Sequence, residues 1–247
     1  NFAKISEPEG LPGGHWAVYD PKTDRVTDLG VGLPRNGIIT MTIDPKRERL
    51  YGLTYPMGHL IYYDIRSRVT ADLGVVQNWA SVSRVLTTDD EGRVYGFYND
   101  GRIWRYDPDR DRVFNLLTQM PLRTPGIPIF RSFFETEHGM MGVARSADGK
   151  KWYGLETESS YLFEYDPEQG DEGATRLLAQ LAPDRYLGRR NVPYAMLAFC
   201  KDPEDVFYHA ANTQLGDEAQ GQYWGEGYGA AMVTYDLKSG RREDRGV

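Results

Sequence analysis

His59-Leu-Ile-Tyr-Tyr-Asp64 decides the fold, because it is one copy of a repeated strand. A six-residue, mostly apolar segment that ends in Tyr-Asp occurs five times, and the final Asp residues are 44, 43, 59 and 70 positions apart. Self-similarity at spacings of tens of residues is typical of proteins built from stacked structural repeats. The other four Tyr-Asp segments are His15-Trp-Ala-Val-Tyr-Asp20, Arg102-Ile-Trp-Arg-Tyr-Asp107, Tyr161-Leu-Phe-Glu-Tyr-Asp166 and Ala231-Met-Val-Thr-Tyr-Asp236.

Each Tyr-Asp segment stands between other predicted strands. A tight turn follows it, often with proline as at Pro21 and Pro108, where proline presets φ and the Asp carboxylate can cap the turn. A hairpin precedes it, with strands at 38–44 and 50–55 joined by the polar turn 45–48. Four strands per repeat, with no helical periodicity, predict an all-β fold: a β-propeller of four-stranded antiparallel blades.

We expect one β-propeller domain over residues 1–247, with about five blades visible. The first repeat contains only the last three strands of a blade. Either a partner segment supplies its inner strand or the chain belongs to a larger, seven-bladed ring, and we favour the second interpretation. The predicted blades cover approximately residues 1–33, 34–77, 78–120, 121–183 and 184–247.

Small residues mark the second strand of the blades. Tyr-Gly pairs at Gly52, Gly96 and Gly154 occupy matching places, which predicts a close approach between neighbouring sheets. The single Cys200 excludes an intrachain disulfide, and we expect it to be a small buried residue in the first strand of the fifth blade.

The composition argues against two classes of partner. The chain has 29 Lys and Arg against 36 Asp and Glu, a formal net charge of −7, which disfavours broad attraction to nucleic acid or anionic lipid. No apolar run approaches the roughly 20 residues that cross a bilayer. The first residues also lack the apolar stretch of a signal peptide. We therefore expect a soluble chain with no nucleic-acid and no membrane partner. Because the sequence lacks an initial Met, the absence of a signal peptide does not identify the cellular compartment.

The histidines are the first candidates for chemistry. In a propeller, the connections between blades and the hairpins between second and third strands share one face, around the channel mouth. His15 and His59 begin equivalent third strands, His138 precedes the first strand of the fourth blade, and His209 lies toward the end of a second strand. We predict all four on that face as candidate ligands of a divalent metal, with His59 and His138 as acid/base candidates. The alternative is that each is hydrogen-bonded within its own blade.

Arginines recur in the segments that lead into the first strand of each complete blade. They are Arg35, Arg84, Arg131 and Arg189, followed by Arg190. A guanidinium group matches a carboxylate or sulfate bidentately, so this pattern favours an anionic ligand. Pairing of each arginine with an acidic neighbour between blades is the open alternative.

Aromatic residues fall in the same connections, where flat rings suit stacking on sugars. The insertion 212–229 is long and aromatic, as in a binding loop, although an apolar plug over an outer blade is the alternative. The candidate sugar-stacking residues are Tyr55, Tyr98, Tyr194 and Trp224.

Repeats such as Leu50-Tyr-Gly-Leu-Thr-Tyr-Pro-Met-Gly-His59 and Trp152-Tyr-Gly-Leu-Glu156 give the chain a resemblance to bacterial propeller proteins of the polysaccharide-lyase type. Ulvan and oligogalacturonate lyases belong to that group. The resemblance implies an extracellular or periplasmic protein that binds and cleaves an anionic, uronate-containing polysaccharide by β-elimination. Such a reaction needs a neutralised carboxylate, a base and a proton donor. The alternative function is a non-catalytic scaffold for protein or ligand binding.

Overall fold

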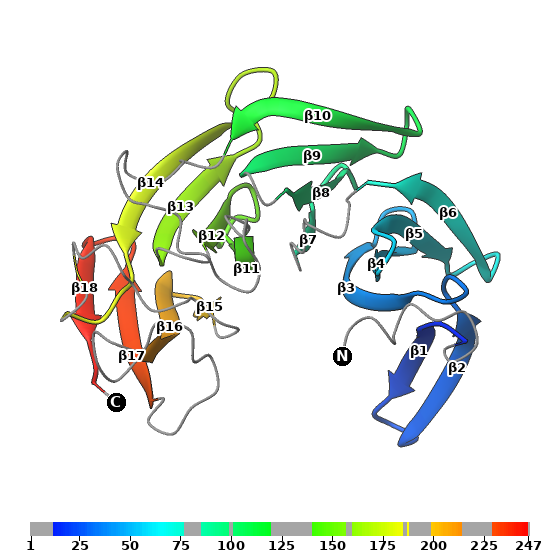
Figure 1. Cartoon of the computed structure of the whole chain (residues 1–247), viewed down its shortest axis with the longest axis horizontal. Helices are drawn as coiled ribbons and strands as arrows, with labels where there is room; N and C mark the ends of the chain where they lie inside the picture. The colour runs from blue at the N-terminus through cyan, green and yellow to red at the C-terminus, as the bar shows by residue number, and fades with distance from the viewer. Residues whose placement is uncertain are drawn as a thin grey trace. The chain divides into compact units, whose positions relative to one another are not determined.

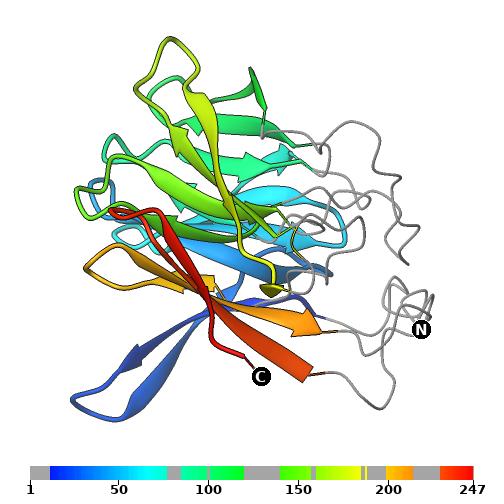
Figure 2. The same cartoon turned by 90° about the vertical axis from the view of Figure 1, so that its left-hand side faces the viewer.

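The computed structural model describes residues 12–76, 85–98, 101–119, 140–156, 160–184, 187, 199–213 and 229–246. These residues contain eighteen β-strands, and within each sheet the strands pair with those next to them in the chain (Figures 1 and 2). No helix in this part of the chain is long and apolar enough to cross a bilayer.

The strands form one two-stranded and four four-stranded sheets, each in chain order. The first contains β1 (His15–Asp20) and β2 (Arg25–Val31). The second contains β3 (Gly37–Asp44), β4 (Arg49–Tyr55), β5 (His59–Asp64) and β6 (Val69–Val75). The third contains β7 (Leu86–Thr88), β8 (Val94–Phe97), β9 (Arg102–Asp107) and β10 (Arg112–Gln119). The fourth contains β11 (Met140–Arg145), β12 (Trp152–Glu156), β13 (Tyr161–Asp166) and β14 (Ala174–Gln180). The fifth contains β15 (Phe199–Lys201), β16 (Val206–Thr213), β17 (Gly229–Asp236) and β18 (Arg241–Asp244).

This architecture confirms the predicted four-stranded antiparallel blades. Of the three strands that we expected in the first repeat, the structure describes two, β1 and β2. The prediction of the strand before them falls outside the described residues, which begin at residue 12. Internal contacts divide the chain into two compact units, one of residues 1–96 and 105–114 and one of 97–104 and 115–247. The division passes through the third sheet, and each unit is described by itself below.

The same turn follows all five Tyr-Asp segments. A carboxylate oxygen of each Asp accepts a hydrogen bond, 2.8–3.0 Å long, from a backbone N–H two or three residues later. This confirms the predicted capping role of the Asp. The residue four positions after the Asp has a positive φ in every copy, and these residues are Asp24, Arg68, Asp111, Gly170 and Gly240.

In the first unit, the Tyr of a Tyr-Asp segment packs against the preceding sheet. The ring centroids of Tyr63 and Trp16 are 6.2 Å apart, and those of Tyr106 and Tyr51 are 5.9 Å apart. A Cβ atom on Gly52 would lie 2.8 Å from the Trp16 ring, so only glycine fits there. The close approach of sheets predicted from the Tyr-Gly pairs is confirmed at this position.

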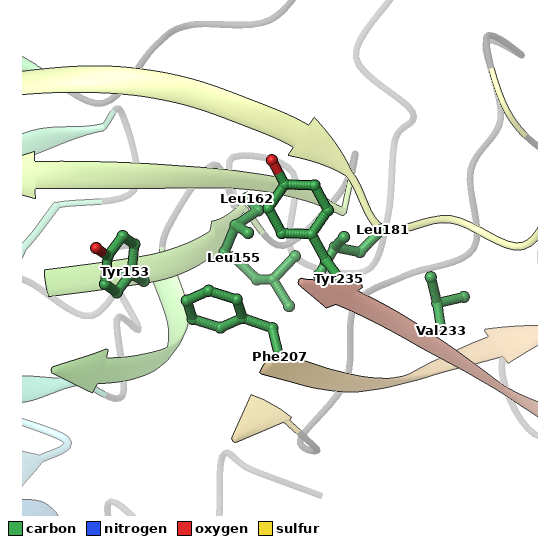
Figure 3. Packing of buried hydrophobic residues seen from close by; sticks show 7 residues of the cluster. All are labelled: Tyr153, Leu155, Leu162, Leu181, Phe207, Val233 and Tyr235. Carbon is green, nitrogen blue, oxygen red and sulfur yellow. The ribbon is translucent and has the colours of Figure 1, made fainter. Parts of the chain in front are cut away.

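The second unit repeats this packing. Tyr235 joins a buried cluster with Tyr153 and Leu162 of the sheet before it, and Phe207 lies edge-on to Tyr153 with 5.0 Å between ring centroids (Figure 3). In these three pairs of neighbouring sheets, the Tyr of the later sheet therefore packs on the facing side of the earlier sheet.

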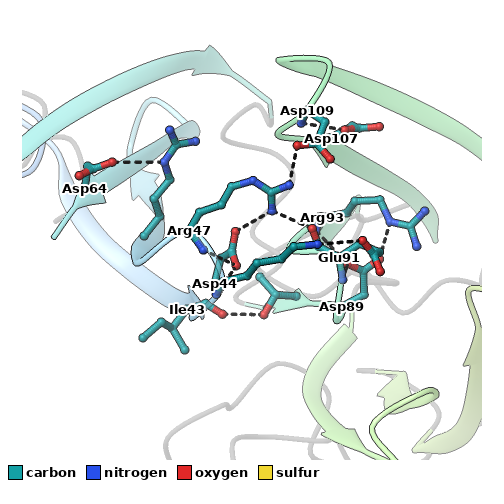
Figure 4. Close-up of polar contacts among 12 residues, drawn as sticks. Ile43, Asp44, Arg47, Asp64, Asp89, Glu91, Arg93, Asp107 and Asp109 are labelled. Atoms are coloured by element: carbon teal, nitrogen blue, oxygen red, sulfur yellow. Dashed lines mark hydrogen bonds and ion pairs between the residues drawn. The ribbon is translucent and has the colours of Figure 1, made fainter. Parts of the chain in front are cut away.

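Polar contacts also join neighbouring sheets of the first unit. Arg47 donates to the buried carboxylate of Asp44 at 3.1 Å, to the backbone oxygen of Glu91 at 2.7 Å and to Asp109 at 2.6 Å (Figure 4). A Cβ atom on Gly92 would collide with the Asp44 carboxylate and the Arg47 guanidinium group. Glycine at this turn therefore lets the two hairpins approach closely enough for Arg47 to bridge them.

Candidate functional site

His59 is the acid/base candidate that the structure describes, and it is held by a carboxylate. Its Nδ1 lies 2.9 and 3.0 Å from the two carboxylate oxygens of Asp72 on β6, and its backbone N–H donates to Thr54 Oγ1 at 3.0 Å. The His59 side chain is 19% exposed. An ionised carboxylate only accepts hydrogen bonds, so Nδ1 carries the proton, and in the neutral ring Nε2 retains its lone pair.

His15 makes the same contact one blade earlier. Its Nδ1 lies 2.9 Å from both carboxylate oxygens of Asp28 on β2, and its side chain is 43% exposed. The backbone N–H of Gly30 and, second, the His15 ring hold the pKa of Asp28 below its ordinary value. Each of these histidines is thus bonded within its own blade, as the alternative interpretation of the sequence expected.

The aspartates of these pairs belong to an Asp-x-Gly turn. Asp28 and Asp72 each accept a hydrogen bond from the backbone N–H two residues later, at 2.8–2.9 Å. A third turn of the same kind occurs at Asp244, where the bond is 2.9 Å long. The acceptor turn ends in a glycine with positive φ in all three copies. The carboxylate partner of each histidine is therefore fixed by local backbone geometry, which holds the imidazole ring in one orientation.

Asn36 connects several predicted site residues of the first unit. This residue is buried, its side-chain oxygen accepts the backbone N–H of Met57 at 3.0 Å, and its backbone oxygen accepts the N–H of Gly14 at 2.7 Å. Met57 lies in the short turn between Tyr55 and His59. We call this arrangement the Asn36 corner. It places the segment containing Arg35 beside the hairpin that carries Tyr55 and His59.

Two predicted site residues, Arg35 and Tyr55, lie at the Asn36 corner. Arg35 is exposed, and its backbone has a φ of 63°, in the left-handed region. Burial raises the pKa of the Tyr55 phenol above its ordinary value. Sequence reasoning missed Asn36, although its position just before Gly37 in the connection between blades is typical of a turn residue.

In the third blade, Arg102 and Asn115 take the positions of the His–Asp pair. The Tyr98 hydroxyl donates to Asn115 Oδ1 at 2.9 Å, and the Arg102 guanidinium carbon lies 5.3 Å from the centre of the Tyr98 ring. Tyr98 is therefore held by its own blade. The contacts described for this predicted sugar-stacking residue are structural.

Two predictions about single residues in the second unit need correction. His209 does not lie near a strand end, because β16 continues to Thr213, and His209 is 2% exposed between Phe199 and Val233 of the flanking strands. Cys200, expected to be buried, is exposed on β15.

The remaining candidates cannot be placed. No group of three or more His, Cys, Asp or Glu residues suited to a metal ion occurs in the part of the chain that the structure describes. Most of the insertion 212–229 lies outside that part. The predicted site residues outside it are His138, Arg84, Arg131, Arg189, Tyr194 and Trp224.

Comparison with known proteins relates this arrangement of sheets to a known fold. No protein-family model matches the chain, and no curated protein matches its sequence. Solved structures do match, over nearly the whole chain. One is an auxiliary nutrient binding protein from Bacteroides thetaiotaomicron, with a TM-score of 0.55, 15% identity and coverage of 95% of this chain and 57% of that one. The fold is a β-propeller.

Two further structures are similar to the same extent. TolB from Acinetobacter baumannii has a TM-score of 0.54 and 10% identity, with 95% of this chain and 50% of that chain covered. A putative 6-phosphogluconolactonase from Bacteroides uniformis has a TM-score of 0.56 and 12% identity, with 94% and 63% covered. The chain therefore spans between half and two thirds of the length of these three propeller-like proteins, and the likeness concerns the fold alone.

Proposed function

We propose that this propeller binds an anionic, uronate-containing polysaccharide at the Asn36 corner and cleaves it by β-elimination. The observation that carries the proposal is the bond between His59 Nδ1 and both oxygens of Asp72, at 2.9 and 3.0 Å. A carboxylate that fixes the ring and its proton leaves Nε2 as a base of constant orientation.

The corner supplies groups for each part of the reaction. Arg35 pairs with the uronate carboxylate and makes the α-proton more acidic. His59 Nε2 removes that proton, and the electron pair left on carbon forms a double bond while the bond to the leaving glycosidic oxygen breaks. The Tyr55 phenol, which is protonated at neutral pH because its ordinary pKa is about 10, donates its proton to that oxygen.

The test is incubation with a panel of uronate polysaccharides, followed by ultraviolet absorbance of the unsaturated product. His59→Ala is expected to lower kcat at least about 100-fold, the usual contribution of a positioned general base. His15→Ala removes the same kind of His–Asp pair from the preceding blade and serves as the matched comparison. Equal losses of kcat in the two variants, or no product from any polymer, would contradict the proposal.

A non-catalytic binding scaffold is the second candidate, and one observation favours it. Because the same His–Asp pair occurs at His15 and His59 on Asp-x-Gly turns, it has a role in the fold of both blades. In that case both alanine variants lose similar stability, and polymer binding occurs without product formation. Isothermal titration calorimetry with the intact polymers measures binding, and the absorbance assay measures cleavage, so the two together separate the functions.

A further inference from the structure

Three arginine side chains contact one phenylalanine ring on the hairpin that joins β9 to β10 (Figure 1). The ring belongs to Phe114 on β10. The guanidinium carbons of Arg105, Arg110 and Arg112 lie 5.7, 5.8 and 5.2 Å from its centre. These distances are within the range of about 6 Å over which a cation and an aromatic ring attract each other. We call these four residues the Phe114 cluster.

The Phe114 cluster lies on an exposed side of the hairpin. Arg105 is next to Tyr106 on β9, and successive side chains of a strand point to opposite faces. Because Tyr106 packs against Tyr51 of the second sheet, Arg105 points away from that contact. The side chain of Arg110 is 68% exposed, and Arg112 is exposed as well. The cluster is therefore a positively charged surface that solvent and ligands can reach.

Most of the acidic groups of the hairpin are bound elsewhere. Asp109 accepts a hydrogen bond from Arg47 of the second sheet at 2.6 Å (Figure 4). Asp111 accepts one at 2.8 Å from a tyrosine hydroxyl group on the other face. Only Asp107 approaches the cluster, with Oδ2 at 3.7 Å from Arg110 Nε, while its Oδ1 accepts two backbone N–H groups of the turn.

Two arginines of the Phe114 cluster have no acidic partner. Among the described residues, no carboxylate pairs with Arg105 or Arg112. Arg105 Nε is buried and makes no hydrogen bond to that part of the chain. Three guanidinium groups beside the single carboxylate of Asp107 leave two positive charges in excess. Like charges gathered around one ring repel each other, and a bound anion removes that repulsion.

We propose that the Phe114 cluster binds a phosphate group, either free or esterified to a small molecule. The guanidinium group matches phosphate geometry with two parallel N–H donors. A phosphate monoester carries a charge of about −1.5 to −2 at pH 7, which balances the excess charge of the cluster. The site is separate from the Asn36 corner, because His59 begins β5 whereas this cluster lies where the equivalent strand β9 ends. A strand of this length spans about 20 Å.

Isothermal titration calorimetry with sodium phosphate tests the proposal, with the ionic strength held constant by sodium chloride. The wild-type chain is expected to bind phosphate with a dissociation constant of about 1 mM or lower. Arg105→Gln and Arg112→Gln each remove one guanidinium group and keep a polar side chain. Each is expected to raise the dissociation constant about tenfold. Circular dichroism checks that the variants are folded.

Arg25→Gln is the matched control and is expected to leave phosphate binding unchanged. Arg25 begins β2 five positions after the Asp of its Tyr-Asp segment, as Arg112 begins β10. In that first repeat Val18 and Thr27 stand in place of Arg105 and Phe114. The control therefore removes the same charge from an equivalent turn that lacks the cluster.

Three outcomes would overturn the proposal. The first is a wild-type chain that binds no phosphate, and the second is equally tight binding in Arg112→Gln, which would make the cluster purely structural. The third is binding that Arg35→Gln abolishes, since the anion would then lie at the Asn36 corner.

Titration with a hexose phosphate distinguishes the two sources of the phosphate group. A dissociation constant at least about tenfold below that of inorganic phosphate, with the same loss in Arg112→Gln, would support an esterified ligand. Equal constants for the two compounds would support the free ion. Hexose phosphate that binds equally well to wild type and to Arg112→Gln would count against the Phe114 cluster as its site.

Discussion

At the residue scale, one backbone conformation recurs in five turns, and different residue types adopt it. Arg68 and Gly170 occupy the same turn position with φ values of 60° and 74°. A side chain in the left-handed region carries a steric cost, whereas glycine does not. A Cβ atom on Gly170 would meet nothing within 4 Å, so the torsion angle alone decides the effect of a substitution there.

Gly170→Ala is therefore expected to destabilise the protein by about 1 kcal/mol. Arg68→Gly relieves the same strain at the cost of a more flexible unfolded chain, so its expected effect lies between zero and about 0.5 kcal/mol of stabilisation. Urea unfolding followed by circular dichroism measures both changes. A larger loss for Arg68→Gly than for Gly170→Ala would show that the Arg68 side chain, and not the torsion angle, determines the stability of its turn.

At the element scale, the hairpins could be predicted from sequence and most of the site could not. A Tyr-Asp segment and its turn depend on residues within five positions of each other, so their pattern is visible in the chain. The bond between His59 and Asp72 crosses two strands whose register shifts at a bulge between His59 and Ile61. A bulge moves the partner by one residue, which alternation of apolar residues does not reveal.

A signal for these pairs was nevertheless present in the sequence. Asp-Leu-Gly occurs at residues 28–30 and 72–74, each time thirteen positions after the histidine it binds. His209 lacked such a signal. The strand around it is longer than the equivalent strand β12, so His209 lies within the strand and not near its end.

The turn carboxylates predict how stability depends on pH. Hydrogen bonds from the backbone N–H and then the hydroxyl group of Ser67 hold the pKa of Asp64 below its ordinary value of 3.8. Because the folded pKa is the lower one, the contribution of Asp64 to stability is complete above the unfolded pKa. It is lost as the pH falls through the folded pKa. Asp20 and Asp236 behave in the same way at their turns.

Asp64→Asn is expected to reduce stability at neutral pH and to make the loss of stability between about pH 5 and pH 2 less steep. The neutral amide keeps an acceptor oxygen but no longer binds a proton differently in the folded and unfolded chain. Urea unfolding at a series of pH values gives the two curves. Parallel curves for wild type and variant would show that Asp64 titrates alike in both states.

At the scale of the whole molecule, stability is a sum of contacts between neighbouring sheets. In repeat proteins each unit contacts only its neighbours, so loss of one contact loosens one end and leaves distant sheets intact. Trp16 is the main apolar contact of the first sheet, since it is 2% exposed and packs with Ile61 and Tyr63 of the second sheet. The first sheet has only two described strands and few buried side chains of its own.

Trp16→Ala is expected to remove about 3–5 kcal/mol of packing at this contact. Hydrogen–deuterium exchange followed by mass spectrometry should then show rapid exchange of β1 and β2, while β13 and β14 of the second unit keep their protection. Val18→Ala on the same strand is the control, because Val18 is half exposed and its truncation leaves no cavity. Faster exchange of β13 and β14 in the Trp16 variant would mean that the sheets unfold as one cooperative body, because the loss would then extend beyond the neighbouring sheet.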